Sequence, residues 1–130
     1  MEFARAEQAG DPFAFRFTPQ PYLLRSHGGG FQSAEFPWSD ALLDDLESLR
    51  KPRPDRVTVQ RVGELLRSFV TPLGFDKQTE QIVSASRAGK QVMITFRSAA
   101  AELYALPWEL LCDKQSGQAI GSLPGVLFRY

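Results

Sequence analysis

The last third of the chain begins with Gln91-Val92-Met93-Ile94-Thr95-Phe96-Arg97, and Leu106-Pro107-Trp108-Glu109-Leu110-Leu111 follows it. The first stretch is apolar on both faces at its centre, which predicts a central strand covered on two sides. The second stretch predicts a short helix, because proline suits the first helical position and glutamate suits the first turn. We expect Trp108 to be buried where this helix packs on Val92–Phe96.

Two short strands are predicted downstream, at Gln118–Ile120 and Gly125–Arg129, after a turn at residues 115–117. The Val126–Phe128 segment has the composition of a buried strand, and parallel strands need crossover helices to cover them. No such helix pattern follows in the sequence. We therefore expect an apolar edge or face at this strand, which either pairs with another chain or is covered by the Phe13–Phe17 hairpin.

Helical spacing of apolar residues predicts three helices in the middle of the chain. Ser39 is expected to cap the first, whose apolar stripe runs over Leu42–Leu49. The second is predicted over Arg56–Val70, and Gly63 inside it indicates close packing, since glycine costs a helix about 1 kcal/mol relative to alanine. A third, weaker helix is expected over Asp76–Ala88, with its aspartate as the N-cap.

The first part of the chain has the alternating pattern of strands. Phe13–Phe17, Tyr22–Ser26 and Phe31–Phe36 are separated by proline and glycine residues, which predicts an antiparallel β-meander. Residues 1–11 are expected to be a loosely held leader. The whole chain is thus predicted as a single α/β domain with three parts after the leader: a β-meander at 12–37, a helical segment at 39–89 and a strand/helix/strand unit at 90–130.

Composition limits the chemistry open to this chain. The 130 residues carry 15 basic and 15 acidic side chains, whereas a nucleic-acid binder would usually carry a basic surplus. One cysteine excludes an internal disulfide, and one histidine excludes a multi-histidine metal site. The chain lacks a signal-peptide pattern and any apolar run long enough to span a membrane. We expect a cytoplasmic protein with no cofactor, no metal and no nucleic-acid or membrane partner.

Four features invite a functional interpretation, and each has a commoner structural one. His27 beside three glycines has the makings of a catalytic base, but a turn between two strands is favoured. Cys112 is interpreted as structural, because the C-terminal end of a helix does not lower a thiol pKa. Asp44–Glu47 is interpreted as a solvated helix face. Arg87–Lys90 lacks the glycine spacing of a phosphate-binding loop. No catalytic, cofactor-binding or metal-ligating residue is predicted.

The second half of the chain resembles the CHAT domain, a caspase-like domain of bacterial proteins. The resemblance rests on the Leu106–Leu111 block, which Ala101-Glu102-Leu103 and a hydrophobic strand precede. A polar turn and a strand ending in Val126-Leu127-Phe128-Arg129 complete it. The resemblance covers residues 90–129 strongly and 12–89 loosely. It implies the start of a caspase-like α/β sheet and, for the whole domain, cysteine endopeptidase activity.

The catalytic residues of this family do not map onto the chain. In intact CHAT domains a histidine, in a His-Gly pair, and a cysteine lie on strands that follow the Arg-ending strand. His27 precedes the Leu106–Leu111 block and Cys112 directly follows it, so neither matches a catalytic position. Arg129 does match a family position, either as a structural residue at the strand end or as one that meets an acidic substrate side chain.

The leading hypothesis is therefore the N-terminal portion of a CHAT-type caspase-like cysteine endopeptidase. Such a portion is catalytically incomplete by itself, and its partner is the remaining part of the domain. The alternative is a non-enzymatic protein–protein interaction or regulatory module that pairs with another chain or with a second copy. A third, weaker hypothesis is an unrelated small enzyme that uses His27. A reading frame that continues into the His-Gly and Cys strands would separate the first two.

Overall fold

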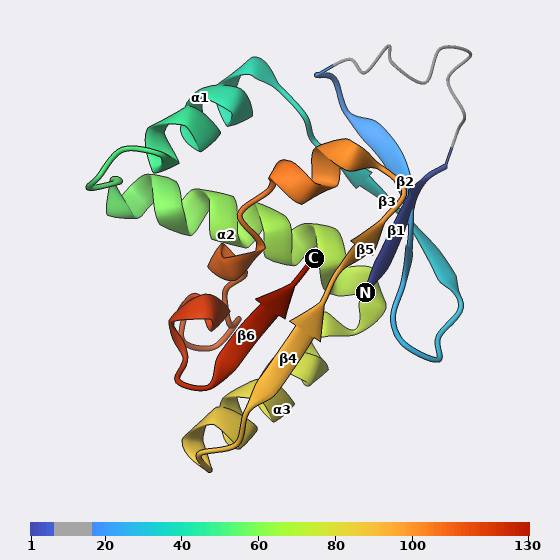
Figure 1. Ribbon diagram of the computed structural model, residues 1–130. Helices are drawn as coiled ribbons and strands as arrows, with labels where there is room; N and C mark the ends of the chain where they lie inside the picture. The colour runs from blue at the N-terminus through green and yellow to red at the C-terminus, as the bar shows by residue number, and fades with distance from the viewer. Residues whose placement is uncertain (7–16) are drawn as a thin grey trace.

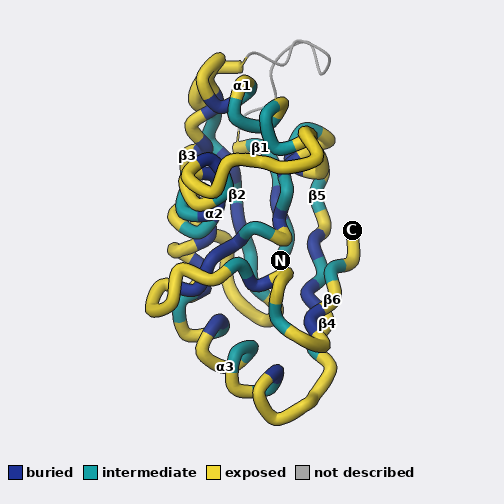
Figure 2. The backbone as a smooth tube through the Cα atoms, turned by 90° about the vertical axis from the view of Figure 1, so that its left-hand side faces the viewer, coloured by how far each residue is buried: buried dark blue, intermediate teal, exposed yellow. Residues whose placement is uncertain are grey.

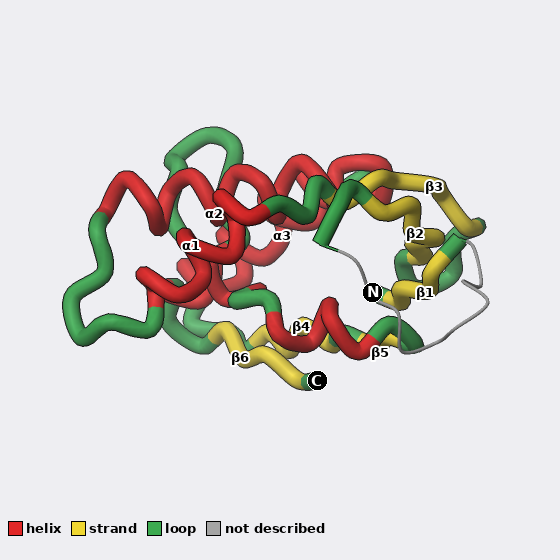
Figure 3. The backbone as a smooth tube through the Cα atoms, turned by 90° about the horizontal axis from the view of Figure 1, so that it is seen from above, coloured by secondary structure: helices red, strands yellow, loops and turns green. Residues whose placement is uncertain are grey.

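The computed structural model describes residues 1–6 and 17–130 and has a small α/β fold with two sheets (Figure 1). The larger sheet is mixed, and its strands lie in the order β3 (Phe31–Phe36), β2 (Gln20–Arg25), β1 (Glu2–Arg5) and β5 (Arg97–Ser98). The smaller sheet pairs β4 (Val92–Thr95) in parallel with β6 (Val126–Arg129). Seen from above, α2 and α3 lie on one side of β4 and β6 (Figure 3).

The described residues form three α-helices, α1 (Asp40–Leu49), α2 (Arg56–Val70) and α3 (Phe75–Arg87). The cap of the first is confirmed, since Ser39 Oγ accepts the Leu42 N–H at 3.1 Å. The bounds of the second are confirmed as well. The predicted cap of α3 is wrong. Gly74, with a φ of 72°, directs the chain straight into the helix, so Asp76 falls in the first turn and pairs with Arg67 at 3.2 Å.

Residues Glu2–Arg5 form an inner strand of the larger sheet, antiparallel to β2 and parallel to β5. The prediction of a loosely held leader over residues 1–11 is therefore wrong for this strand, and residues 7–11 lie outside the described residues. The physical reason is that Phe3 is buried and stacks on Trp108, with ring centroids 5.1 Å apart. Arg5 of the same strand donates a hydrogen bond to the Glu102 carboxylate.

Two strands of the predicted meander are confirmed, as the antiparallel pair β2 and β3. The predicted strand at Phe13–Phe17 lies outside the described residues except for its last residue. Phe17 occupies a bend and is exposed. Within the described chain, the third strand of this meander is instead β1.

The stretch Gln91–Arg97 is not the single central strand that its apolar character predicts. It divides at Phe96 into β4 and β5, which belong to different sheets. β4 pairs with β6 on one side only, and burial alternates along it, with Met93 59% exposed beside buried Ile94 (Figure 2). The division arises because Phe96 donates its N–H to the Arg129 carbonyl of β6. The next residue, Arg97, donates its N–H in the opposite direction, to the Met1 carbonyl beside β1.

The remaining elements of the described part of the chain are four short 3₁₀ turns, η1 (Thr71–Leu73), η2 (Ala101–Ala105), η3 (Trp108–Leu110) and η4 (Ile120–Ser122). The helix predicted at Leu106–Leu111 is thus one turn, and Pro107 precedes it. The strand predicted at Gln118–Ile120 shrinks to one bridge, between Cys112 and Ala119, because the chain enters η4 directly afterwards.

The core lies between the larger sheet, α2 and the Trp108 turn. Burial of Trp108 is confirmed: its ring stacks on Phe96 at 4.7 Å, and its indole N–H donates to the Leu103 carbonyl at 2.7 Å. The close contact expected at Gly63 is confirmed too. A Cβ at Gly63 would lie 2.5 Å from the Leu110 carbonyl oxygen, so α2 and η3 approach backbone to backbone.

Candidate functional site

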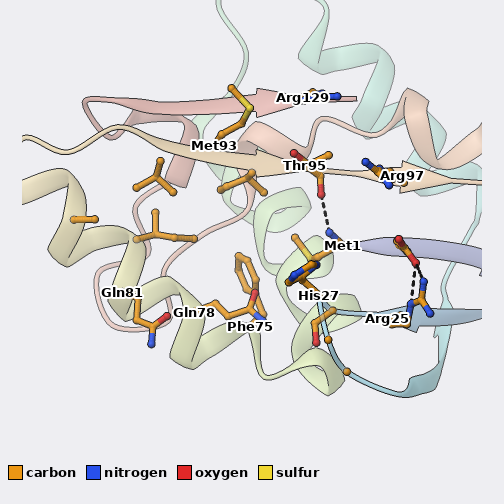
Figure 4. Close-up of a pocket in the computed structure, with 18 residues that line it drawn as sticks. Met1, Arg25, His27, Phe75, Gln78, Gln81, Met93, Thr95, Arg97 and Arg129 are labelled. Carbon is orange, nitrogen blue, oxygen red and sulfur yellow. Dashed lines mark hydrogen bonds and ion pairs between the residues drawn. The ribbon is translucent and has the colours of Figure 1, made fainter.

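A groove of about 1140 Å³ opens between β4, α3 and the turn that joins β2 to β3 (Figure 4). One wall is a face of α3, since Gln78, Gln81, Ile82 and Ala85 follow one another at helical spacing. The other wall is the edge of β4. Uncharged residues, both apolar and polar, thus form these two walls of the groove, and its charged residues lie on the neighbouring strands and at Met1.

The edge of β4 that faces the groove is not used by β6. Val92 donates its N–H to the Gly125 carbonyl at 2.9 Å, and Phe96 donates to the Arg129 carbonyl at 2.8 Å. Backbone groups of successive residues in a strand point to opposite sides. Residues at even positions of β4 thus bond to β6, and residues at odd positions direct their N–H and C=O away from it.

The odd positions are Met93 and Thr95. The Thr95 carbonyl accepts a hydrogen bond from the Met1 amino group at 2.6 Å, and the Met1 carbonyl accepts the Arg97 N–H at 2.9 Å. β1 therefore covers this side of the β4–β5 segment from the Thr95 carbonyl onward, and the part of the β4 edge before that carbonyl is not paired with β1. Among the described residues, the N–H and C=O of Met93 and the N–H of Thr95 have no hydrogen-bond partner.

Positive charge dominates the rim of the groove. Arg97 and Arg129 are exposed, and neither forms an ion pair with another described residue. Glu2 is the one carboxylate in the described lining, and Arg25 pairs with it. The hydrogen bond from Arg25 lowers the pKa of Glu2, which keeps this carboxylate ionised and neutralised. Burial lowers the pKa of the Met1 amino group.

His27 lies on the groove wall, in the turn between β2 and β3. The interpretation as a turn is confirmed: Gly28 has a φ of 74°, and Gly29 donates its N–H to the Ser26 carbonyl at 3.1 Å. The described lining of the groove contains neither a cysteine nor an aspartate. The groove thus brings His27 together with basic and apolar residues and with the hydroxyl side chains of Ser26 and Thr95, and with no thiol of the described chain.

Cys112 does not line this groove, and its side chain is buried beside α2. Burial, together with the neighbouring Glu64, raises the pKa of the thiol to about 11. A thiol of this kind stays protonated at neutral pH, so it is a poor nucleophile. The structural interpretation of Cys112 is supported.

The other two candidate features also have structural roles. Asp45 of the acidic cluster pairs with Arg61 of α2 at 2.6 Å, and the described residues hold no group of three or more side chains suited to a metal ion. Arg87–Lys90 ends α3: Gly89 has a φ of 71°, and Lys90 donates its N–H to the Ala85 carbonyl at 3.0 Å.

A largely buried polar network, missed by sequence reasoning, joins β1, β2, η2 and the loop before α1. Arg5 contacts both oxygens of Glu102 at 2.9 and 2.8 Å, Tyr22 donates its hydroxyl to Glu102 at 2.9 Å, and Trp38 donates its indole N–H to Tyr22 at 2.9 Å. Burial, together with the neighbouring carboxylate, raises the pKa of the Tyr22 hydroxyl. No local pattern reveals this network, because its members come from separate segments of the chain.

A comparison with protein-family models, curated proteins and solved structures finds no match to this chain. Within residues 1–6 and 17–130, no helix combines the length and the apolar character needed to cross a bilayer.

Proposed function

We propose that this chain is the N-terminal portion of a CHAT-type caspase-like cysteine endopeptidase, and that it supplies part of the scaffold and no catalytic dyad. The resemblance of residues 90–129 supports this proposal, with Leu106–Leu111 and Val126–Arg129 as the segments that carry it. In the structure Val126–Arg129 is β6, one of the two strands of the smaller sheet, and further strands of a larger sheet would join at its free side.

The single observation that carries the proposal is the incomplete surrounding of the β4–β6 pair. No strand of the described chain pairs with β6 on the side away from β4. Met93 and Leu127 are cross-strand neighbours, and they are 59% and 48% exposed. Parallel sheets are generally covered on both faces. An open apolar pair of this kind is typical of a sheet that further strands and helices complete.

The same observation favours a second candidate function, a non-enzymatic interaction or regulatory module in which another chain covers Met93 and Leu127. In both cases the 130-residue chain is inactive as a peptidase. His27 lines the groove, whereas Cys112 is buried beside α2 with a raised pKa, so the two do not form a dyad.

The test compares the 130-residue chain with the product of the natural reading frame that contains it. Both are assayed with a library of fluorogenic peptides. We expect hydrolysis by a longer protein alone, abolished when the cysteine of its later strand is replaced, and no hydrolysis by the 130-residue chain with or without His27→Ala. Hydrolysis by the short chain that His27→Ala abolishes would contradict the proposal. A natural product of the same length, isolated with a stoichiometric partner, would favour the interaction module.

A further inference from the structure

We propose that the groove beside β4 binds an extended acidic segment of a partner protein, which adds to the free edge of β4 as a further strand. This inference goes beyond the proposed function, because it concerns the edge of β4 opposite β6. It holds whether or not further strands follow β6.

The backbone supplies the binding groups. The N–H and C=O of Met93 and the N–H of Thr95 face the groove without a hydrogen-bond partner in the described chain. A strand added to a sheet edge binds through main-chain hydrogen bonds of this alternating kind. β1 already uses the same side of the β4–β5 segment from Met1 onward, so an added strand would lie in line with β1.

The walls of the groove favour one apolar face on the added strand. Ile82 and Ala85 of α3 are half-buried and line the side opposite β4, and Phe75 closes the interior. Side chains of a strand alternate between its two faces. Every second residue of the segment would therefore contact α3, and the intervening residues would point away from it.

The charges of the rim select an acidic segment. Arg97 and Arg129 lack ion-pair partners among the described residues, and the charge of Glu2 is balanced by Arg25. The groove-lining polar residues of α3 are the uncharged Gln78 and Gln81. Complementary charge favours one partner and repels the opposite one. An acidic segment is thus attracted, and a basic segment of the same shape is disfavoured.

Binding of two fluorescein-labelled peptides, measured by anisotropy, tests the charge preference. One is an extended peptide of alternating valine and glutamate, and the other has lysine in place of glutamate. We expect saturable binding of the glutamate peptide, at least tenfold tighter than that of the lysine peptide. The double variant Arg97→Glu/Arg129→Glu should reverse the preference. The matched control Arg53→Glu changes an exposed arginine outside the groove and should leave it unchanged.

A second variant tests the strand addition itself. Met93→Pro removes an N–H that faces the groove. It removes no hydrogen bond between β4 and β6, and sheets tolerate proline at such positions of an edge strand. It should weaken binding at least tenfold, whereas Met93→Ala, which keeps the N–H, should change binding less than threefold. Circular dichroism checks that both variants fold. If Met93→Pro does not fold, the arginine variant decides.

Three results would overturn the inference. They are the absence of saturable binding, equal binding of the two peptides, and binding that neither the arginine variant nor a folded Met93→Pro weakens. Occupation of the groove by a second copy of the chain, seen as self-association that Met93→Pro abolishes and the acidic peptide does not displace, would overturn it as well.

Discussion

Arg5 and Glu102 are 97 positions apart in the chain, yet they form a two-point ion pair with N–O distances of 2.9 and 2.8 Å. The pair fixes the inner strand β1 to η2. The Glu102 side chain is only 9% exposed, and Tyr22 adds a third hydrogen bond to it. This single carboxylate therefore ties together the first strand, the second strand and the segment before the Trp108 turn.

Replacing Glu102 with glutamine should destabilise the fold. The substitution removes the charge that pairs with Arg5 and weakens the hydrogen bonds that this carboxylate accepts from Arg5 and Tyr22. We expect a loss of about 1–3 kcal/mol in the free energy of unfolding by urea, less than for a fully buried pair because Arg5 keeps some contact with water. The control is Asp45→Asn, which breaks the more exposed pair with Arg61 and should cost less than about 1 kcal/mol. Equal losses in both variants would contradict this prediction.

The contribution of Glu102 should depend on pH. Burial alone would raise the pKa of its carboxyl group, but hydrogen bonds from Arg5, from the backbone and from Tyr22 outweigh burial, so the pKa lies below its usual value. A carboxyl whose pKa is lower in the folded state stabilises the fold above its unfolded pKa, which is about 4.3. That stability is lost as the pH falls through the folded pKa.

Urea unfolding over a pH series measures this effect. The difference in stability between the wild type and Glu102→Gln should be complete at neutral pH and should shrink as the pH falls below about 4. A difference that stays constant throughout the acid range would show that the carboxylate charge is not what stabilises the fold.

Trp108→Ala should cost about 3–5 kcal/mol, as other large-to-small changes in a core do. The ring stacks on Phe3 and Phe96, so the change leaves a cavity between β1 and the β4–β5 segment. Trp108→Phe is the control and should cost less. Trp108 fluorescence, recorded in a Trp38→Phe background, should be that of a buried indole. A water-like emission together with normal melting of the alanine variant would contradict the prediction.

Gly63→Ala should destabilise the protein although alanine is the better helix former by about 1 kcal/mol. The new methyl group would lie 2.5 Å from the Leu110 carbonyl oxygen, so α2 and η3 would have to separate. We expect a net loss of about 1–3 kcal/mol by thermal or urea unfolding. Ser68→Ala, on the exposed face of the same helix, is the control and should be neutral or slightly stabilising. Stabilisation by Gly63→Ala would refute the close contact.

The isolated chain should self-associate through the outer face of β4 and β6. Light scattering after size exclusion, at several concentrations, should show a mass that rises with concentration. Leu127→Lys should restore the monomer, because it adds a charge to the exposed apolar face. Val57→Lys changes an even more exposed apolar residue at the start of α2 and should have no effect. A wild-type chain that remains monomeric at every concentration would contradict the prediction.

Sequence reasoning succeeded where the determinants of structure are local. The bounds of α2 and the cap of α1 follow from an apolar stripe and from side chains within a few residues of the helix ends. It failed where distant partners decide. Glu2–Arg5 has no strand pattern of its own and becomes an inner strand because Phe3 packs on Trp108. The division at Phe96 depends on β1 and β6, which lie at opposite ends of the chain.

The candidate site was predictable only in part, for the same reason. His27 and Arg129 drew attention individually, and Cys112 was correctly interpreted as structural. The groove itself is formed by a face of α3, an edge of β4 and the turn after β2, which come together only in the folded chain. No spacing in the sequence indicates that these three segments meet.

The parallel pairing of β1 with β5 has a consequence for synthesis on the ribosome. β1 leaves the exit tunnel before the other strands of its sheet, and its partner strand β5 and the Trp108 ring that covers Phe3 are translated about a hundred residues later. Until then β2 and β3 can form a hairpin with β1, yet the apolar side of that hairpin has no finished core to pack on. The nascent chain must therefore carry an exposed phenylalanine strand until about a hundred further residues have been translated, and a chaperone that shields such strands would act during that interval.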